Sequence, residues 1–187
     1  MSNIAFVSAA SAAGNALTLP SHQAGDLIVF IAFRDNSNTQ PTIPSGWLFF
    51  PVASGGGTSV HSHVVAYKTA ASSSETSGTW TNATFVACAV YRSTVHLYLG
   101  AGAANVSSTL TLNFPALPAT GISGATIFRS VGVSTWIGCA VVIKTNDTNV
   151  ETGPGAPMTF RTGVSGGSTG ELAVFDSNGD VASYAGA

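Results

Sequence analysis

The chain has 187 residues, with six Lys or Arg and eight Asp or Glu, so that 7% of its side chains are charged, where a typical soluble domain carries about 25%. Hydrophobic residues make up 45%, which excludes disorder of the charged, weakly hydrophobic kind. A net charge of −2 cannot build the basic face that nucleic-acid binding needs. The longest apolar run, residues 27–33, is far shorter than the roughly 18 residues of a membrane-spanning helix. We therefore expect neither nucleic acid nor a membrane as a partner.

The pattern along the chain is that of β-strands separated by turns rich in Gly, Pro, Asn and Ser. Residues 27–33 are a continuous run of β-branched and aromatic side chains, which is typical of a strand buried on both faces. A hairpin about Asn178-Gly179 is expected to join residues 172–175 to 181–184. Further strands are expected at residues 4–7, 16–19, 47–50, 60–68, 79–92, 108–114, 126–128, 136–144, 158–161 and 171–175.

Helical signals are nearly absent. The only helix candidate is the Ala-rich segment 8–13, which Gly14 cuts short. The sequence therefore predicts an all-β protein, an antiparallel β-sandwich or jelly roll with little or no helix. We expect one domain over residues 1–187, with a first half of about 1–92 and a second half of about 93–187.

Cys88 and Cys139 each lie inside an apolar, strand-like run. The simplest interpretation is that both are buried free thiols that pack as small hydrophobic side chains. A disulfide between them stays open, because sequence spacing alone cannot decide it.

His61 and His63 are the most suggestive polar pair. On a strand, residues two apart point to the same face, so both imidazoles could reach one metal ion. Cupin-type metal sites begin with such a pair, but the Glu that follows there is missing, and His96 lacks the Gly and Pro surroundings of the later motif. We predict no metal site and expect both side chains on a solvent-facing or interface-facing strand surface. At a subunit contact they would make the oligomer sensitive to pH.

Two loops contain several oxygen-bearing side chains. Residues 176–180, Asp-Ser-Asn-Gly-Asp, faintly resemble the start of a calcium loop but lack the later acidic residue, so the hairpin turn is favoured. Residues 35–38, Asp-Asn-Ser-Asn, are interpreted in the same way as turn chemistry.

Nothing in the sequence carries a catalytic signature. Serine is so abundant that a chance partner for a triad has no weight, and the scattered acidic residues give no reason to pair any two. The glycine clusters at 55–57 and 166–167 do not open a helix with a Lys, so they are not phosphate loops. We predict that the protein is not an enzyme, with no catalytic, cofactor-binding or metal-binding residues and no cofactor.

Aromatic side chains leave a carbohydrate-binding alternative open, because lectin-like sandwiches stack sugars on exposed rings. Trp80 and Trp136 adjoin strand runs, so the stronger expectation for these two is a place in the core. The aromatic candidates are Trp47, Trp80, Trp136, Tyr91, Tyr98 and Tyr184.

Four short motifs give the chain a resemblance to a known family. They are Gly25-Asp26-Leu27 opening a buried strand, Pro44-Ser45-Gly46-Trp47 after a loop, and strands that end in Tyr67-Lys68 and Tyr91-Arg92. Residues 79–81, 157–161 and 170–176 extend the similarity over most of the chain. In this order the motifs resemble a module common in tailed-bacteriophage virion proteins. Two departures are Ser93, where the module usually has Gly, and the low charge content.

The resemblance implies a β-sandwich with a structural or adhesive role in a virion assembled in the host cytoplasm, and no catalytic residues. We expect a capsid decoration (cement) protein that binds the major capsid protein on the head surface as a homo-oligomer such as a trimer. The alternative is a tail-fibre, tail-tip or head-fibre adhesin that contacts tail proteins and binds a host surface glycan.

Overall fold

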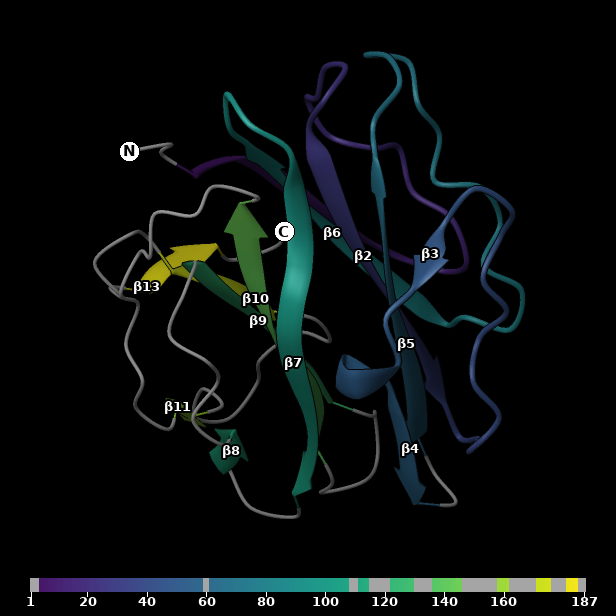
Figure 1. The fold of residues 1–187 in the computed structure, drawn as a ribbon. Coiled ribbons are helices and arrows are strands. Elements are labelled where there is room, and N and C mark those ends of the chain that lie inside the picture. Colours follow the sequence, from purple (N-terminus) through teal and green to yellow (C-terminus); the bar gives the residue numbers. More distant parts are fainter. Residues whose placement is uncertain are drawn as a thin grey trace.

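The structure is a computed structural model, and it describes residues 4–58, 61–107, 111–114, 122–129, 136–145, 158–161, 171–175 and 181–184. Within these residues the regular structure consists of antiparallel β-strands and one short 3₁₀ turn, η1 (Pro51–Ala53). The predicted all-β class is therefore confirmed. Figure 1 shows two sheets side by side, the first formed by the N-terminal strands and the second by the later strands.

The first sheet has the strand order β1-β6-β2-β5-β3, and β4 also pairs with β5. All of these pairings are antiparallel. β2 lies in the centre between β5 and β6 and coincides with the apolar run that the sequence shows. The strands are β1 (Ala5–Ala13), β2 (Leu27–Asp35), β3 (Leu48–Phe49), β4 (Gly55–Thr58), β5 (His61–Thr69) and β6 (Phe85–Arg92).

The second sheet has the order β13-β12-β9-β10-β7, and β8 pairs with β11 in a separate two-stranded sheet. Phe175 pairs with Val181, so the expected hairpin between these two segments is confirmed, while its turn lies outside the described residues. The strands are β7 (Leu97–Ser107), β8 (Thr111–Phe114), β9 (Ile122–Arg129), β10 (Trp136–Thr145), β11 (Met158–Arg161), β12 (Glu171–Phe175) and β13 (Val181–Tyr184).

Apolar side chains cover both faces of the first sheet. On one face, odd-numbered residues of β2 such as Ile31 share a core with Leu99 of β7 and Val141 of β10. On the other face, even-numbered residues such as Phe30 pack beneath loop residues, among them Trp80. Because β2 is buried on both faces, it needs an unbroken apolar run, where a half-exposed strand would alternate. The core shared by the two sheets makes the interior sandwich-like.

Two expected elements differ from the structure. Residues 8–13, the helix candidate, are the second part of β1, where they pair with residues 85–90 of β6. Sheet pairing here overrides the helix propensity of alanine, which is only a weak preference. Residues 16–19, expected as a strand, lie in the loop between β1 and β2. Leu19 of this loop packs into the core that contains Phe30 and Trp80.

Other differences concern strand boundaries. The strand expected from residue 79 begins at Phe85, because residues 80–84 form a turn in which Asn82 has φ +71° and the Ala83 N–H donates to the Trp80 carbonyl. The sequence pattern predicts neither β7 nor the glycine-containing β4. The glycines of β4 allow close approach, since a Cβ atom on Gly55 would lie only 3.3 Å from a side-chain atom of β7.

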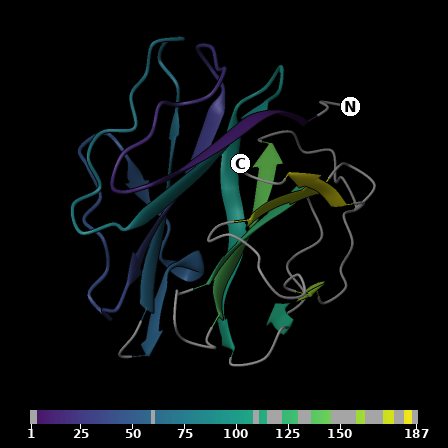
Figure 2. The ribbon, with the colours of Figure 1, turned by 180° about the vertical axis from the view of Figure 1, so that it is seen from behind.

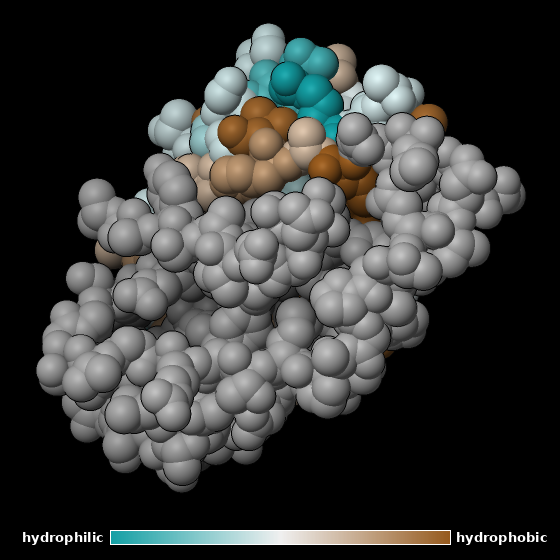
Figure 3. Space-filling view, turned by 90° about the vertical axis from the view of Figure 1, so that its left-hand side faces the viewer, coloured by the Kyte–Doolittle hydropathy of each residue, from teal (hydrophilic) through white to brown (hydrophobic). Residues whose placement is uncertain are grey.

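A few large apolar side chains remain exposed among the described residues. Leu48, Phe49 and Val52 of β3 and η1 are 58%, 48% and 56% exposed, and Phe6 of β1 is 37% exposed. In the view of Figure 3, apolar and strongly hydrophilic surfaces of described residues lie next to one another at one end of the molecule.

Candidate functional site

His61 and His63 share one face of β5, as their spacing predicts, but both are fully buried. Val65, two residues further along the same face, belongs to the core between the two sheets. A Cβ atom placed on Gly55 of β4 would lie 3.3 Å from Cε1 of His63 and 3.3 Å from Cβ of Ala104 in β7, so the second sheet closely covers this region. The expectation of a solvent-facing or interface-facing position is therefore wrong, because β2, β4 and β7 surround the pair.

One carboxylate and one aromatic ring lie beside His61. Its Nδ1 atom is 3.3 Å from Oδ1 of Asp35, whose side chain is 19% exposed, and its ring centroid is 5.7 Å from that of Phe33. Its Nε2 atom is buried and has no hydrogen-bond partner within the described part of the chain. Among these residues no group of three His, Cys, Asp or Glu is placed to hold a metal ion. His61 therefore occupies a position in the packed interior at one end of β5.

Replacement of His61 by leucine tests this packing role. His61→Leu keeps most of the side-chain volume and removes the buried Nε2 atom, which has no hydrogen-bond partner among the described residues. We therefore expect the free energy of unfolding to change by less than about 1 kcal/mol. Val65→Ala, on the same buried face, is the control and should cost about 2 kcal/mol. Urea unfolding followed by circular dichroism gives both values. A loss in His61→Leu larger than in the control would show that the imidazole makes an essential polar contact.

The loop that follows β2 has the turn chemistry expected of it. Asn36 has φ +56°, and its N–H donates to the Asp35 carboxylate at 2.9 Å. The Thr39 N–H donates to Oγ of Ser37 at 3.1 Å. These local hydrogen bonds confirm the interpretation of residues 35–38 as a turn. The other oxygen-rich loop, residues 176–180, lies outside the described residues.

Of the four aromatic candidates for sugar stacking whose burial is described, three are buried. Trp80 and Tyr91 are 0% and 1% exposed, and Trp47 is 8% exposed. Trp80 stacks on Phe30 with ring centroids 4.3 Å apart, as expected for a core residue. Tyr98 is half-buried. Side-chain surroundings of Trp136 and Tyr184 lie outside the described part of the structure.

Gly25 and Asp26, the first of the four motifs, close a junction of three strands. Gly25 has φ +91°, a conformation that favours glycine, and its N–H donates to the Ala70 carbonyl. The carboxylate of Asp26 is buried and accepts hydrogen bonds from Nε and Nη2 of Arg92, both at 2.7 Å. It also accepts the Gln23 N–H at 2.9 Å. The start of β2 is thereby tied to the residue after β5 and to the end of β6.

The other motif residues tie the outer loops to the sheet. The indole N–H groups of Trp47 and Trp80 both donate to the Ser77 carbonyl, at 3.1 and 3.0 Å. Nζ of Lys68 lies 4.7 Å from the ring centroid of Trp47 and donates to Oε2 of Glu75 at 2.6 Å. Asp26, Trp47, Lys68 and Arg92, one residue from each of the four motifs, therefore make structural contacts of the first sheet and its loops.

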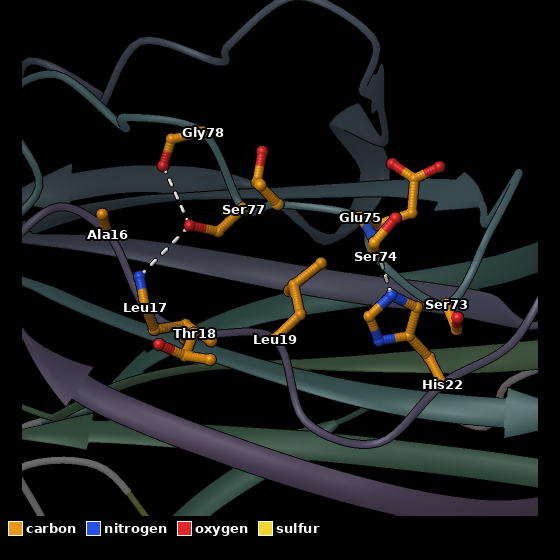
Figure 4. Close-up of a pocket in the computed structure, with 11 residues that line it drawn as sticks. Ala16, Leu17, Thr18, Leu19, His22, Ser73, Ser74, Glu75, Ser77 and Gly78 are labelled. Carbon is orange, nitrogen blue, oxygen red and sulfur yellow. Dashed lines mark hydrogen bonds between the residues drawn. The ribbon is translucent and has the colours of Figure 1, made fainter.

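A pocket of about 500 Å³ lies between two of these loops (Figure 4). Leu17 and Leu19 supply apolar lining, and the imidazole of His22 stands at one side. Hydroxyl groups make up much of the remaining lining, from Thr18, Ser73, Ser74, Thr76 and Ser77.

Hydrogen bonds hold the lining of this pocket in place. Nδ1 of His22 donates to the Pro20 carbonyl at 2.7 Å, and its Nε2 accepts the Glu75 N–H at 3.2 Å, which fits the neutral ring. Oγ of Ser77 accepts the Leu17 N–H at 3.2 Å and donates to the Gly78 carbonyl (Figure 4). Sequence reasoning missed this pocket, because residues 71–78 look like a plain Ser-rich connection. The one signal is that the two lining segments, residues 16–22 and 73–78, contain one His and one Glu and no other charged or titratable side chain.

Asp26 is expected to make folding stability depend on acid. Burial by itself raises the pKa of this carboxyl, but the Arg92 hydrogen bonds and the Gln23 N–H outweigh it, so the pKa lies below the ordinary value of 3.8. The Lys68 ammonium and the Ala71 N–H likewise lower the pKa of Glu75. The unfolded chain therefore binds protons more readily, and the stabilisation is complete above about pH 5 and lost as the pH falls through the folded pKa values.

Urea unfolding over a series of pH values measures this dependence. We expect the free energy of unfolding to fall as the pH drops below about 5, and to fall less steeply in Asp26→Asn, which cannot ionise. Equal slopes in the two proteins would contradict the role of Asp26.

Neither Cys88 nor Cys139 is in a disulfide, as expected, and both are buried. They lie in different cores, Cys88 on the outer face of the first sheet and Cys139 between the sheets, so no disulfide joins them. Burial raises the pKa of Cys88 to about 12.

We expect iodoacetamide at pH 8 to label neither thiol in the folded protein and both in urea, as intact-mass spectrometry would show. Rapid labelling of the folded protein would contradict this burial.

Comparisons of the chain with protein-family models, with curated proteins and with solved structures found no match. Among the described residues, none of the helical structure is long and apolar enough to cross a membrane.

Proposed function

We propose that the chain is a structural protein of a tailed-bacteriophage virion, namely a capsid decoration protein that binds the head surface as a homo-oligomer. The observation that carries the proposal is the role of the motifs that resemble virion modules. Asp26, Trp47, Lys68 and Arg92 all make contacts that join strands or loops of the first sheet. In this chain, therefore, these four motif residues support the framework of the first sheet, which is the part of the fold on which the proposal rests.

The composition supports the same proposal. With 7% charged residues, most of the surface must be made of hydroxyl, amide and apolar groups. Such a surface can pack against neighbouring subunits with few charges to desolvate, and charge desolvation is a main cost of forming an interface. Cement action would be mechanical, because contacts repeated over many copies add up to strong retention on the capsid.

The test is to find where the protein lies in purified virions of the phage or prophage that carries its gene. Quantitative mass spectrometry should find it in a copy number close to a multiple of the capsomer number, and labelled antibody should mark the heads. A protein abundant in the lysate but missing from virions would overturn the proposal.

A second candidate is an adhesin module that binds a host glycan, and the pocket between residues 16–22 and 73–78 favours it. Its hydroxyl groups and apolar floor suit a small polyhydroxylated ligand. Labelled antibody on the tail, together with glycan-array binding that Ser73→Trp abolishes by filling the pocket, would support this candidate. A blank array together with labelled heads would exclude it.

A further inference from the structure

β1 forms one edge of the first sheet, and its outer side is open among the described residues. It pairs with β6 alone, and the described loops place no backbone hydrogen bond on residues 5–13. Figure 2 shows β1, in purple, at the margin of this sheet. In an antiparallel strand, about half of the backbone N–H and C=O groups point away from the paired neighbour. Within the part of the chain that the structure describes, this edge therefore offers a row of unpaired hydrogen-bonding groups.

The edge lacks the usual protection against pairing with another strand. Natural edge strands are kept apart by charged side chains, proline, bulges or short length. β1 is nine residues long, AFVSAASAA, with no charge and no proline. Its one irregularity is a register shift between Phe6 and Ser8, which leaves residues 8–13 in regular pairing with β6. A regular, uncharged segment of six residues is thus left at the edge.

The composition of this segment fits a second copy of itself. Residues 8–13 are Ser and Ala alone, so two such strands can approach without steric conflict between large side chains. β1 itself carries no acidic or basic side chain, so two β1 strands can meet without charge repulsion between their own side chains. In an antiparallel arrangement across a two-fold axis, each strand supplies the groups that the other lacks.

We infer that two copies of the chain join through their β1 strands, antiparallel and edge to edge, so that their first sheets become one continuous sheet. The inference stands apart from the proposed function, because it concerns how two copies meet and not the particle they bind. A two-fold contact of this kind gives dimers and even-numbered assemblies, whereas a trimer, one form expected of a decoration protein, would need a different contact.

Charge placed on the edge tests the inference. Ser11 is half-buried in the middle of the regular segment, so Ser11→Lys and Ser11→Glu each put two like charges close together in the dimer. Native mass spectrometry and sedimentation velocity should show a dimer for the unaltered chain and a monomer for each variant. An equimolar mixture of the two variants should regain the dimer, which a misfolded variant would not do. Asn38→Lys, on the exposed loop after β2, is the control and should remain a dimer.

Cysteine cross-linking locates the two-fold axis. Single cysteines placed in turn at residues 6–12 should form a disulfide between copies at one or two adjacent positions only, because a residue faces its own copy only near the axis. Cys88 and Cys139 are buried and should contribute no background. An unaltered chain that stays monomeric at high concentration, or an oligomer that Ser11→Lys and Ser11→Glu leave intact, would overturn the inference.

Discussion

Trp80→Ala is expected to lower the free energy of unfolding by about 3–5 kcal/mol, the range for deleting a large buried aromatic side chain. Trp80 is fully buried, stacks on Phe30 and lies edge-on to Trp47 with ring centroids 5.4 Å apart. Its indole N–H also donates to the Ser77 carbonyl. The substitution therefore leaves a cavity beneath the outer loops and removes one hydrogen bond.

Urea unfolding followed by far-ultraviolet circular dichroism measures this loss without depending on tryptophan fluorescence. Phe49→Ala is the matched control, because Phe49 is 48% exposed and should cost no more than about 0.5 kcal/mol. If Trp80→Ala cost no more than the control, the outer loops would not form a core on the first sheet.

Arg92→Leu is expected to destabilise the fold by about half as much as Trp80→Ala, because it leaves the buried Asp26 carboxylate without its cation. The loss stays below that of a fully buried ion pair, since the Arg92 side chain is 38% exposed and water screens part of the interaction. The same urea measurement applies. Arg34→Leu is the control, since the Arg34 contact to the Thr39 carbonyl is long, at 3.5 Å.

A double variant separates loss of the ion pair from loss of packing. Asp26→Asn combined with Arg92→Leu has no buried charge, and the amide oxygen that replaces the carboxylate can still accept the Gln23 N–H. The double variant should therefore be more stable than Arg92→Leu alone. A double variant less stable than either single variant would show that the two side chains contribute independently.

Part of the fold can be predicted from the sequence, because the pattern of apolar side chains in a strand depends on which of its faces are buried. The apolar run of β2 predicts burial on both faces, and the structure provides a core on each side. β7 was missed because after Leu97 and Leu99 it contains Gly, Ala and Asn, which give no alternation of large apolar side chains. Its strand state depends on pairing with β10, a contact between distant segments.

The candidate site was harder to predict than the fold. Alternation along β5 predicts that His61 and His63 share a face, but not whether that face meets water. Burial of this face depends on Gly55 and Ala104, which belong to other strands and bring the second sheet close to it. Asp26 and Arg92 are 66 residues apart, so their ion pair also depends on the register of β2 with β6.

Binding to virus particles tests the central claim, a structural role on the virion, most directly. Purified protein should be mixed with virions from a phage that lacks its gene, and the pelleted particles analysed for bound protein. We expect saturable binding at a stoichiometry fixed by the number of capsomers, and retention of the protein through repeated washing. Protein that stays in the supernatant at every concentration would contradict the account.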